Sequence, residues 1–258
     1  MAQAPAYPAR VEILGCPLDP WTMAQTVART AELVEEGGFA HLIGVNADKV
    51  LQMRDDSAMA EVVSRCEVVN ADGASMVMAA ERLGVGVPER VSGIDLMGEL
   101  CALAAERSWG VYLLGARADV VVEAASRLEE AYPGLRIVGA RDGYFGPGEY
   151  AAVAEEVRAA SPAITFVGIT SPKKEEVIES FRAAGLSGAF VGVGGSFDVV
   201  SGRIPRAPLW MQRARLEWLF RMAQEPGRLL KRYVVGNARF LRLLRREERA
   251  LRKEAGAG

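Results

Sequence analysis

The residue best suited to acid–base chemistry in this sequence is Asp72, within the segment Asn70-Ala71-Asp72-Gly73. The segment follows a short apolar run and precedes a helical pattern that begins near Ala74, so Asp72 stands between a strand and a helix. One interpretation is a helix N-cap, whose side chain accepts a hydrogen bond from the first helical turn. The other is a general base that takes a proton from a hydroxyl group, which is typically worth about 10²–10⁴ in rate. The local sequence leaves both interpretations open.

Few other side chains compete with Asp72 for this role. The only histidine, His41, opens an apolar run, and we expect it to be buried in a strand for structural reasons. The sequence contains no Asp-x-Asp and no cluster of carboxylates or histidines, so we predict no metal ion and no cofactor. Cys16, Cys66 and Cys101 are isolated among apolar neighbours, which is typical of buried reduced thiols. Carboxylates remain as the natural base candidates.

A glycine-rich turn is the second feature with chemical potential. Gly194-Gly195-Ser196 follows an apolar run, and small residues there let backbone amides approach a phosphate closely. The turn is not a complete Gly-x-Gly-x-x-Gly fingerprint, because Phe197 stands in place of the last glycine. A phosphate site and a purely structural tight turn are both compatible with this segment.

The elements that must position these residues alternate along most of the chain. Short apolar runs predict strands at Val11–Leu14, His41–Val45, Glu67–Val69, Gly110–Leu114, Arg136–Val138, Ile164–Ile169 and Ala189–Val193. Apolar positions three or four apart predict helices at Trp21–Glu36, Ala47–Cys66, Gly93–Arg107, Ala118–Tyr132, Pro147–Ala160 and Lys173–Ala184. This alternation predicts a Rossmann-like α/β fold, a mostly parallel sheet with helices on both faces.

Polar residues gather directly after five of the expected strands. In an open parallel sheet, ligands bind in the crevice beyond the carboxyl ends of the strands. The segments at these ends are Asn46, Asn70–Gly73, Gly115–Arg117, Thr170–Lys174 and Gly194–Asp198. Their common direction predicts one site at this edge of the sheet, with Asp72 facing the crevice.

The pattern changes at Ser201, after which helical stretches are broken by three prolines, Pro205, Pro208 and Pro226. Because proline is tolerated only in the first turn of a helix, we expect one helix to end and another to begin at Pro226. We therefore divide the chain into an α/β domain, residues 1–202, and a helical appendage, residues 203–258. The appendage has 15 Lys or Arg and 5 Asp or Glu, a balance of +10, whereas the rest of the chain carries −12.

A basic appendage on an acidic body indicates an anionic partner. Arg221, Arg228 and Lys231 flank the proline break, among the aromatic residues Trp210, Trp218, Phe220, Tyr233 and Phe240. Basic side chains mixed with aromatic ones suit an anionic membrane surface. Packing of the apolar stripe on the body, or against a second copy in a homo-oligomer, is equally compatible with the composition. Nucleic acid is not expected, because no nucleic-acid-binding module is recognisable.

Several segments together resemble the WecG/TagA/CpsF glycosyltransferases, in order and in spacing, from about Val11 to Leu244. They include Val45-Asn46-Ala47, Asn70-Ala71-Asp72-Gly73, Glu89-Arg90-Val91-Ser92-Gly93-Ile94-Asp95, Ser171-Pro172-Lys173-Lys174-Glu175, Gly192-Val193-Gly194-Gly195-Ser196-Phe197-Asp198 and Leu216-Glu217-Trp218-Leu219-Phe220-Arg221.

The resemblance implies a metal-independent, inverting transferase. Its expected donor is a UDP-sugar, often UDP-N-acetylmannosamine, and its expected acceptor is a sugar on a polyprenyl diphosphate, in the assembly of teichoic acid, enterobacterial common antigen or exopolysaccharide. It also implies a cytoplasmic protein that lies peripherally on the inner face of the cell membrane. The N-terminal residues lack the apolar core of a signal peptide, and no window approaches a membrane span, which agrees with this location.

The resemblance assigns roles to individual residues. Asp72 matches the probable base, and the matching substrate-binding residues are Asn46, Arg90, Lys174, Arg221, Arg228 and Lys231. The last three would be brought over the active site by the appendage, which also attaches to the membrane. The residues expected to hold the nucleotide are Gly115, Gly194, Gly195, Ser196 and Asp198.

Three residues depart from the family pattern. Gly44 stands where Thr is common, Lys174 where many members have Gln, and Lys231 where a third Arg is usual. Lysine keeps the charge of arginine but loses the planar fork that grips a phosphate, and Gly44 lacks a hydroxyl for a sugar contact. Glucose or another hexose is therefore an alternative to N-acetylmannosamine.

The sequence bears differently on two other classes of protein. A nucleotide-dependent oxidoreductase would need a complete Gly-x-Gly-x-x-Gly after an early strand, and none is present. A non-catalytic sensor that binds nucleotide-sugars and has a helical membrane tail remains compatible with the sequence.

Overall fold

The computed structural model describes residues 7–213, 216–224 and 226–255 and contains an open sheet of six strands, all paired in parallel. In spatial order the strands are β4 (Val68–Ala71), β3 (Phe39–Val45), β8 (Gly188–Gly192), β7 (Ile164–Gly168), β5 (Gly110–Gly115) and β6 (Arg136–Arg141). The inner strands are apolar nearly throughout because helices cover both faces. The predicted α/β fold with a mostly parallel sheet is confirmed.

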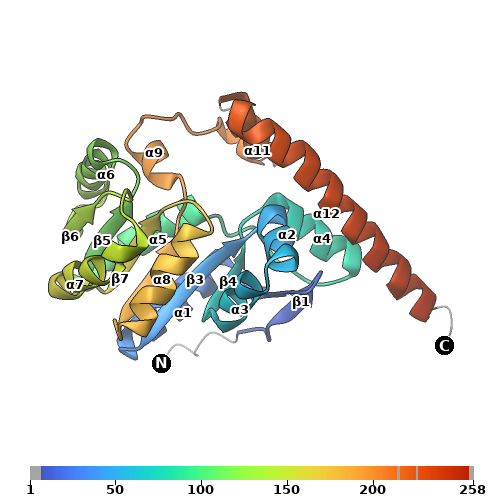
Figure 1. Cartoon of the computed structure of the whole chain (residues 1–258), viewed down its shortest axis with the longest axis horizontal. Helices are drawn as coiled ribbons and strands as arrows, with labels where there is room; N and C mark the ends of the chain where they lie inside the picture. The colour runs from blue at the N-terminus through green and yellow to red at the C-terminus, as the bar shows by residue number, and fades with distance from the viewer. Residues whose placement is uncertain (1–6, 214–215, 225, 256–258) are drawn as a thin grey trace.

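The helices form two layers around the sheet (Figure 1). One face packs against α1 (Met23–Glu35), α5 (Gly93–Arg107) and α6 (Ala118–Ala131). The other packs against α2 (Ala47–Asp55), α3 (Ser57–Arg65), α4 (Ala74–Leu83), α7 (Tyr150–Ala160) and α8 (Lys173–Ala183). A short 3₁₀ turn, η1 (Pro147–Glu149), leads into α7. The expected helices therefore take their places on both faces of the sheet.

The first expected strand belongs to a different element. Residues Val11–Ile13 form β1, which pairs in antiparallel fashion with β2 (Cys16–Leu18), a strand absent from the sequence-based prediction. Leu14 and Gly15 connect them with φ angles of 57° and 78°. A two-residue hairpin turn of this kind needs positive φ at both positions. The chain therefore reverses at once, and β1 stays outside the parallel sheet.

The single helix predicted for Ala47–Cys66 is wrong in one respect, because the segment forms two helices. Asp56 separates α2 from α3 with an extended backbone, φ −138° and ψ 110°. Its side chain accepts a hydrogen bond from the backbone N–H of Ala58 at 2.9 Å, which caps α3. An aspartate that bonds the neighbouring backbone in this way competes with continuation of the helix.

The described residues after Ser201 contain helices and no strands: α9 ends at Val200, and α10 (Leu209–Arg213), α11 (Glu217–Gln224) and α12 (Pro226–Ala255) follow. The break expected at Pro226 is present, since α12 begins there. Figure 1 shows α12 along one side of the α/β body, next to α2 and α4. Phe240 and Leu244 of α12 are buried in the apolar cluster that α2 and α4 share. Part of the appendage therefore belongs to the hydrophobic core.

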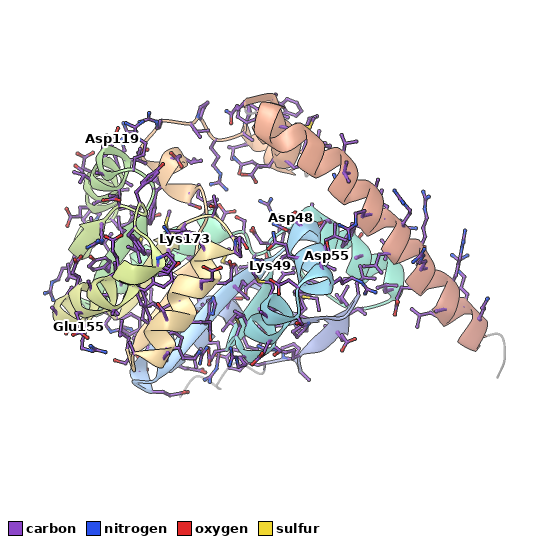
Figure 2. The ribbon with its side chains drawn as sticks, viewed as in Figure 1. Asp48, Lys49, Asp55, Asp119, Glu155 and Lys173 are labelled. Carbon is purple, nitrogen blue, oxygen red and sulfur yellow. The ribbon has the colours of Figure 1, made fainter. Side chains whose placement is uncertain are left out.

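An ion pair adds to this contact. Arg239 of α12 donates two hydrogen bonds to the carboxylate of Asp55 at the end of α2, at 2.8 and 2.9 Å. Figure 2 labels Asp55 where α2 faces α12. Both side chains are exposed, and water screens an exposed pair of this kind, so it contributes little to stability. The apolar contact of Phe240 therefore dominates the attachment.

We expect Phe240→Ala to lower the free energy of unfolding by about 3–5 kcal/mol, the usual cost of removing a buried phenyl ring. Phe240 is only 1% exposed, so its truncation leaves a cavity between α12 and the body. Urea denaturation followed by circular dichroism measures the change. Val234→Ala, on an exposed part of the same helix, is the matched control and should change little. Equal stability of the two variants would contradict the packing role of Phe240.

Candidate active site

The candidate site lies where two neighbouring strands send the chain to opposite faces of the sheet. Strand β3 leads into α2 on one face. Its neighbour β8 leads into α9 (Ser196–Val200), whose Phe197 is buried in the core of the other face. The chain diverges between the carboxyl ends of β3 and β8, and such a point is where open α/β sheets bind their ligands.

Asp72 lies at this edge, just past β4. Its backbone N–H donates to the carbonyl oxygen of Val45 at 3.0 Å, which places it beside the end of β3. Gly73, not Asp72, is the N-cap of α4, and no side chain caps that helix. The Asp72 carboxylate instead accepts a hydrogen bond from the N–H of Gly93, the first residue of α5, through Oδ1 at 3.2 Å. The amino end of a helix favours a negative charge, so α5 stabilises the Asp72 carboxylate.

Gly44 makes room for this carboxylate. A Cβ atom at Gly44 would lie 2.8 Å from the Cβ of Asp72, which is closer than non-bonded carbon atoms approach in proteins, and 3.3 Å from its Oδ2. The glycine at position 44 therefore determines where the Asp72 side chain can lie. A threonine in its place would displace Asp72 from this position.

Asn46 stands next to Asp72 and starts α2. Its Oδ1 accepts the N–H of Lys49 at 3.1 Å, so Asn46 is the N-cap of α2. A Cβ at Gly73 would lie 2.7 Å from the Cβ of Asn46, so these two loops are in close contact. The structure thus brings Asn46 and Asp72 together, as expected of one site.

The opposite side of the crevice is formed by the ends of β7 and β8. Lys174, in the first turn of α8, is buried and lies across Gly192, where a Cβ would be 2.8–2.9 Å from the end of the lysine side chain. Gly194, with φ 53°, and Gly195 have no heavy atoms near their open side. These two backbones are therefore accessible to a ligand, whereas Lys174 is held against the strand.

The remaining nucleotide-binding candidates, Gly115, Ser196 and Asp198, each make a close contact or a hydrogen bond within the protein. Gly115, with φ 140°, ends β5 so close to the backbone of Gly168 that no side chain would fit. The hydroxyl of Ser196 donates to the carbonyl oxygen of Val193 at 2.7 Å and is buried, so it closes the turn. The carbonyl oxygen of Asp198 accepts the N–H of Ile204 at 2.9 Å, which holds the chain that leaves α9.

Arg90 links the body to the helices of the appendage. Its Nη1 donates to Oε2 of Glu217 in α11 at 3.0 Å, and Glu217 is itself buried. Asp95, 3.9 Å from Arg90, also accepts hydrogen bonds from Ser92 and Arg206. Burial raises the pKa of Asp95, but the bonds from Ser92 and Arg206 outweigh it and bring the pKa below 3.8. Asp95 therefore stays ionised and holds the first residues of the appendage.

A buried ion-pair network ties the two sides of the crevice together. Lys49 of α2 donates to Glu175 of α8 at 2.8 Å and to Ser171 at 2.6 Å. Lys174 lies 3.3 Å from the same carboxylate oxygen of Glu175. Burial raises the pKa of Glu175, but the charges of Lys174 and Lys49 more than offset it, so the pKa falls from 4.5 to about 2. Lys49 is labelled in Figure 2 on α2.

This network was missed by sequence reasoning. Lys49 and Glu175 follow site segments by a few residues, but nothing local distinguishes them from solvated charges on a helix. His41 is buried as expected: its Nδ1 lies 3.1 Å from Oε1 of Glu179, and burial lowers its pKa, so the ring is neutral. Sequence reasoning assigned Asn70 no role beyond its place in the Asn70–Gly73 segment. In the structure it is buried beside Gly44, and neither its Oδ1 nor its Nδ2 has a hydrogen-bond partner.

The side chains of three candidate residues lie outside the described part of the structure. The side chains of Arg221, Arg228 and Lys231 are not described, although the helices that carry them, α11 and α12, are. Within residues 7–213, 216–224 and 226–255, no group of three or more His, Cys, Asp or Glu side chains is arranged to hold a metal ion. No helix in the same ranges is long and apolar enough to cross a membrane.

A second hollow occurs at the other edge of the sheet, at the amino ends of the strands. It is wide and shallow, and its lining includes Trp109, Gly110, Arg136, Ser161 and Gly188. The lining contains one charged side chain, Arg136, and no carboxylate, histidine or cysteine. It therefore lacks the groups for acid–base chemistry that the β3–β8 crevice provides.

A carboxylate on a helix amino end, beside glycine turns at a divergence point, is typical of α/β proteins that bind a ligand at the carboxyl edge of an open parallel sheet. A sequence model of the glycosyl transferase WecG/TagA/CpsF family matches residues 11–254. The chain belongs to this family and is a glycosyltransferase. The family implies, in general, a nucleotide-sugar donor, a lipid-linked acceptor and a place in the synthesis of cell-wall polymers. The resemblance inferred from the motifs is confirmed.

We expect Lys49→Met to lower the free energy of unfolding by about 3–5 kcal/mol at pH 7, because it removes one cation from a buried carboxylate.

Glu175 has a lower pKa when folded, so its ion pairs stabilise the protein above pH 4.5, and this contribution disappears as the pH falls toward 2. Wild type should therefore lose more stability between pH 5 and pH 3 than Lys49→Met/Glu175→Met does. Urea denaturation across this pH range measures both slopes, and parallel slopes would show that the network is not the source.

Proposed function

We propose that the chain transfers a hexose or N-acetylhexosamine from a UDP-sugar to a sugar on a polyprenyl diphosphate, with inversion and without a metal ion, in the synthesis of a cell-wall or extracellular polysaccharide. The observation that carries the proposal is the position of Asp72, a carboxylate at the amino end of α5 and at the divergence of β3 and β8. Family membership supports the reaction class.

Asp72 acts as the general base in this proposal. The acceptor hydroxyl gives its proton to the carboxylate while its oxygen attacks the anomeric carbon of the donor from the face opposite UDP. The bond between the anomeric carbon and the phosphate oxygen breaks, and UDP leaves with the electron pair. Because the N–H of Gly93 holds Oδ1, the orientation of the carboxylate is set before the acceptor binds.

The other candidate residues surround this centre. Asn46, next to Asp72, contacts the sugar, and Lys174, in the first turn of α8, lies across Gly192 at the end of β8. The open backbones of Gly194 and Gly195, with Gly115, Ser196 and Asp198 around them, hold the nucleotide. Cations near the diphosphate stabilise its developing charge when no metal is used. Arg90 and the appendage cations Arg221, Arg228 and Lys231 fill this role.

The donor is UDP-N-acetylmannosamine or a UDP-glucose type of sugar, and two observations bear on this choice. Gly44 lacks a hydroxyl, and Lys174 is held by Glu175 and packed on Gly192. Both positions differ from the family pattern, one on each side of the crevice in which the sugar would lie. A UDP-glucose type of donor is therefore the alternative to UDP-N-acetylmannosamine.

We expect wild-type protein, incubated with a panel of UDP-sugars and a lipid-linked N-acetylglucosamine acceptor, to yield a glycosylated lipid detectable by mass spectrometry. Asp72→Asn should lower turnover by about 10²–10⁴ because it loses the proton acceptor but still accepts the Gly93 hydrogen bond. Asp48→Asn, in the first turn of neighbouring α2, is the matched control and should retain activity. Wild-type turnover in Asp72→Asn, with UDP bound normally, would disprove the general-base role.

The proposal places the protein in the cytoplasm, on the inner face of the cell membrane. The appendage carries exposed apolar side chains on helices in contact with one another: Leu209, Trp210, Trp218, Leu219, Val234 and Val235. Leu209 and Trp210 are 68% and 64% exposed. Together with the appendage balance of +10, this surface fits an anionic lipid bilayer. The helices that contact the membrane also adjoin Arg90, so membrane binding and the site are neighbours.

We expect Leu209→Ser/Trp210→Ser to weaken binding to vesicles that contain phosphatidylglycerol by about 10-fold or more, since burial of each side chain contributes about 1.5–3 kcal/mol. Vesicle sedimentation measures the affinity. Val122→Ser changes an apolar side chain of α6 that is 62% exposed and far along the chain from the appendage, and it should bind as wild type does. Unchanged binding, with a change in oligomeric state on a sizing column, would assign this surface to a homo-oligomer instead.

A further inference from the structure

Asn70 is a buried amide whose hydrogen-bonding capacity is unused. It lies on β4, its side chain is 4% exposed, and neither Oδ1 nor Nδ2 has a partner. A primary amide can donate through two N–H bonds and accept through its oxygen. Burying these groups without partners destabilises a protein, so an unpaired buried amide calls for an explanation.

The surroundings of Asn70 indicate where a partner would bind. Asn70 is paired in register with Gly44 across β4 and β3, so their α-carbons lie side by side on the sheet. The amide lines a narrow recess, and Asn70 is its one polar side chain; the other lining residues are Leu42, Ile43, Gly44, Val91, Gly93, Leu96, Val191 and Gly192. Three of them are glycines, which leave the backbone bare.

The recess adjoins the proposed base. Gly44, on one wall, is the residue whose missing Cβ makes room for Asp72, and Gly93, on another, donates its N–H to the Asp72 carboxylate. A sugar whose anomeric carbon lies near Asp72 would therefore have a ring substituent within reach of the recess. The free volume of the recess is about 10 Å³, which is room for a single small polar group, such as a hydroxyl or the polar end of an amide.

We propose that Asn70 is a specificity-determining residue that binds a ring substituent of the donor sugar carrying both a hydrogen-bond donor and an acceptor. A hydroxyl group and an acetamido group share this chemistry, since each offers one polar hydrogen and one acceptor oxygen. The inference rests on the proposed transfer from a UDP-sugar and names the residue that distinguishes donors. The amide remains unpaired until the sugar arrives, and its pairing then contributes to recognition of the sugar and not of UDP.

The test uses Asn70→Leu, which has nearly the same shape but no polar group, and Asn70→Ala, which is smaller. Thr165→Val, a buried polar-to-apolar change on β7 outside the recess, is the matched control. Calorimetry measures the affinity of each full-length protein for UDP, UDP-glucose, UDP-N-acetylglucosamine and UDP-N-acetylmannosamine. Thermal unfolding gives Tm, and the lipid-acceptor assay gives kcat/KM.

We expect Asn70→Leu to bind UDP as wild type does and to lose about 10- to 100-fold in affinity and kcat/KM for the UDP-sugar that wild type prefers, because the buried substituent loses its partner. Its Tm should equal or exceed that of wild type, since an unpaired buried amide is gone. If Asn70→Leu folds poorly, Asn70→Ala should show the same selective loss. A loss confined to UDP-N-acetylhexosamines identifies an acetamido group, and a loss with UDP-glucose as well identifies a hydroxyl.

Two results would overturn the inference in distinguishable ways. Wild-type affinity for UDP-sugars in both Asn70 variants, with active wild-type enzyme, would show that the amide is structural while the transfer reaction stands. Loss of UDP affinity in equal measure would also refute it, because the defect would then not concern the sugar. Absence of transfer from every UDP-sugar by wild type itself would instead remove the proposed function, and the inference with it.

Discussion

The candidate site depends on a carboxylate that is almost completely removed from water. Glu175 lies in the first turn of α8, and it is neutralised by Lys49 from α2 and by its neighbour Lys174. A buried charge is tolerated only with such partners, so α2 and α8 must approach from the two sides of the crevice. The start of α2 carries Asn46, and the start of α8 carries Lys174. The ion pairs thus set the distance between groups that are proposed to contact one substrate.

Close backbone contacts set the position of the proposed base with equal precision. Gly44 lets β3 lie against Asp72, and the N–H of Gly93, at the amino end of α5, donates a hydrogen bond to the carboxylate. Local structure and chemistry agree here, because the hydrogen bond that orients Asp72 also stabilises its charge. Asn70 follows a different logic. It weakens the core by its unpaired amide, which is the pattern expected where a protein gives up stability for ligand recognition.

The C-terminal helices connect the site to the surface. Phe240 and Leu244 anchor α12 in the core beside α2, while Arg90 and Asp95 hold α11 and the chain before it. The same helices expose Leu209 and Trp210. Under the proposed function, an appendage attached at one end to the core and at the other to site residues would connect membrane contact with the active site without any separate domain movement. Core packing involves Phe240 and Leu244, whereas the proposed membrane contact involves other parts of these helices, so the two do not exclude each other.

The spacing of apolar residues and the positions of prolines determine much of this protein's secondary structure from the sequence alone. Buried parallel strands are apolar runs in the sequence, and the polar residues after them lie at one edge of the sheet, so the sheet and the region around Asp72 could be predicted from local pattern. The helix break at Pro226 could be predicted from the proline itself. The apolar pattern did not predict features that depend on one turn or one side chain. Examples are the hairpin at Leu14-Gly15 and the division of α2 from α3 at Asp56. Only the tertiary structure could decide which charges are buried together, as with Lys49 and Glu175, and which polar group is left unpaired, as with Asn70. Burial and pairing are properties of residues distant in the chain, and no local spacing encodes them.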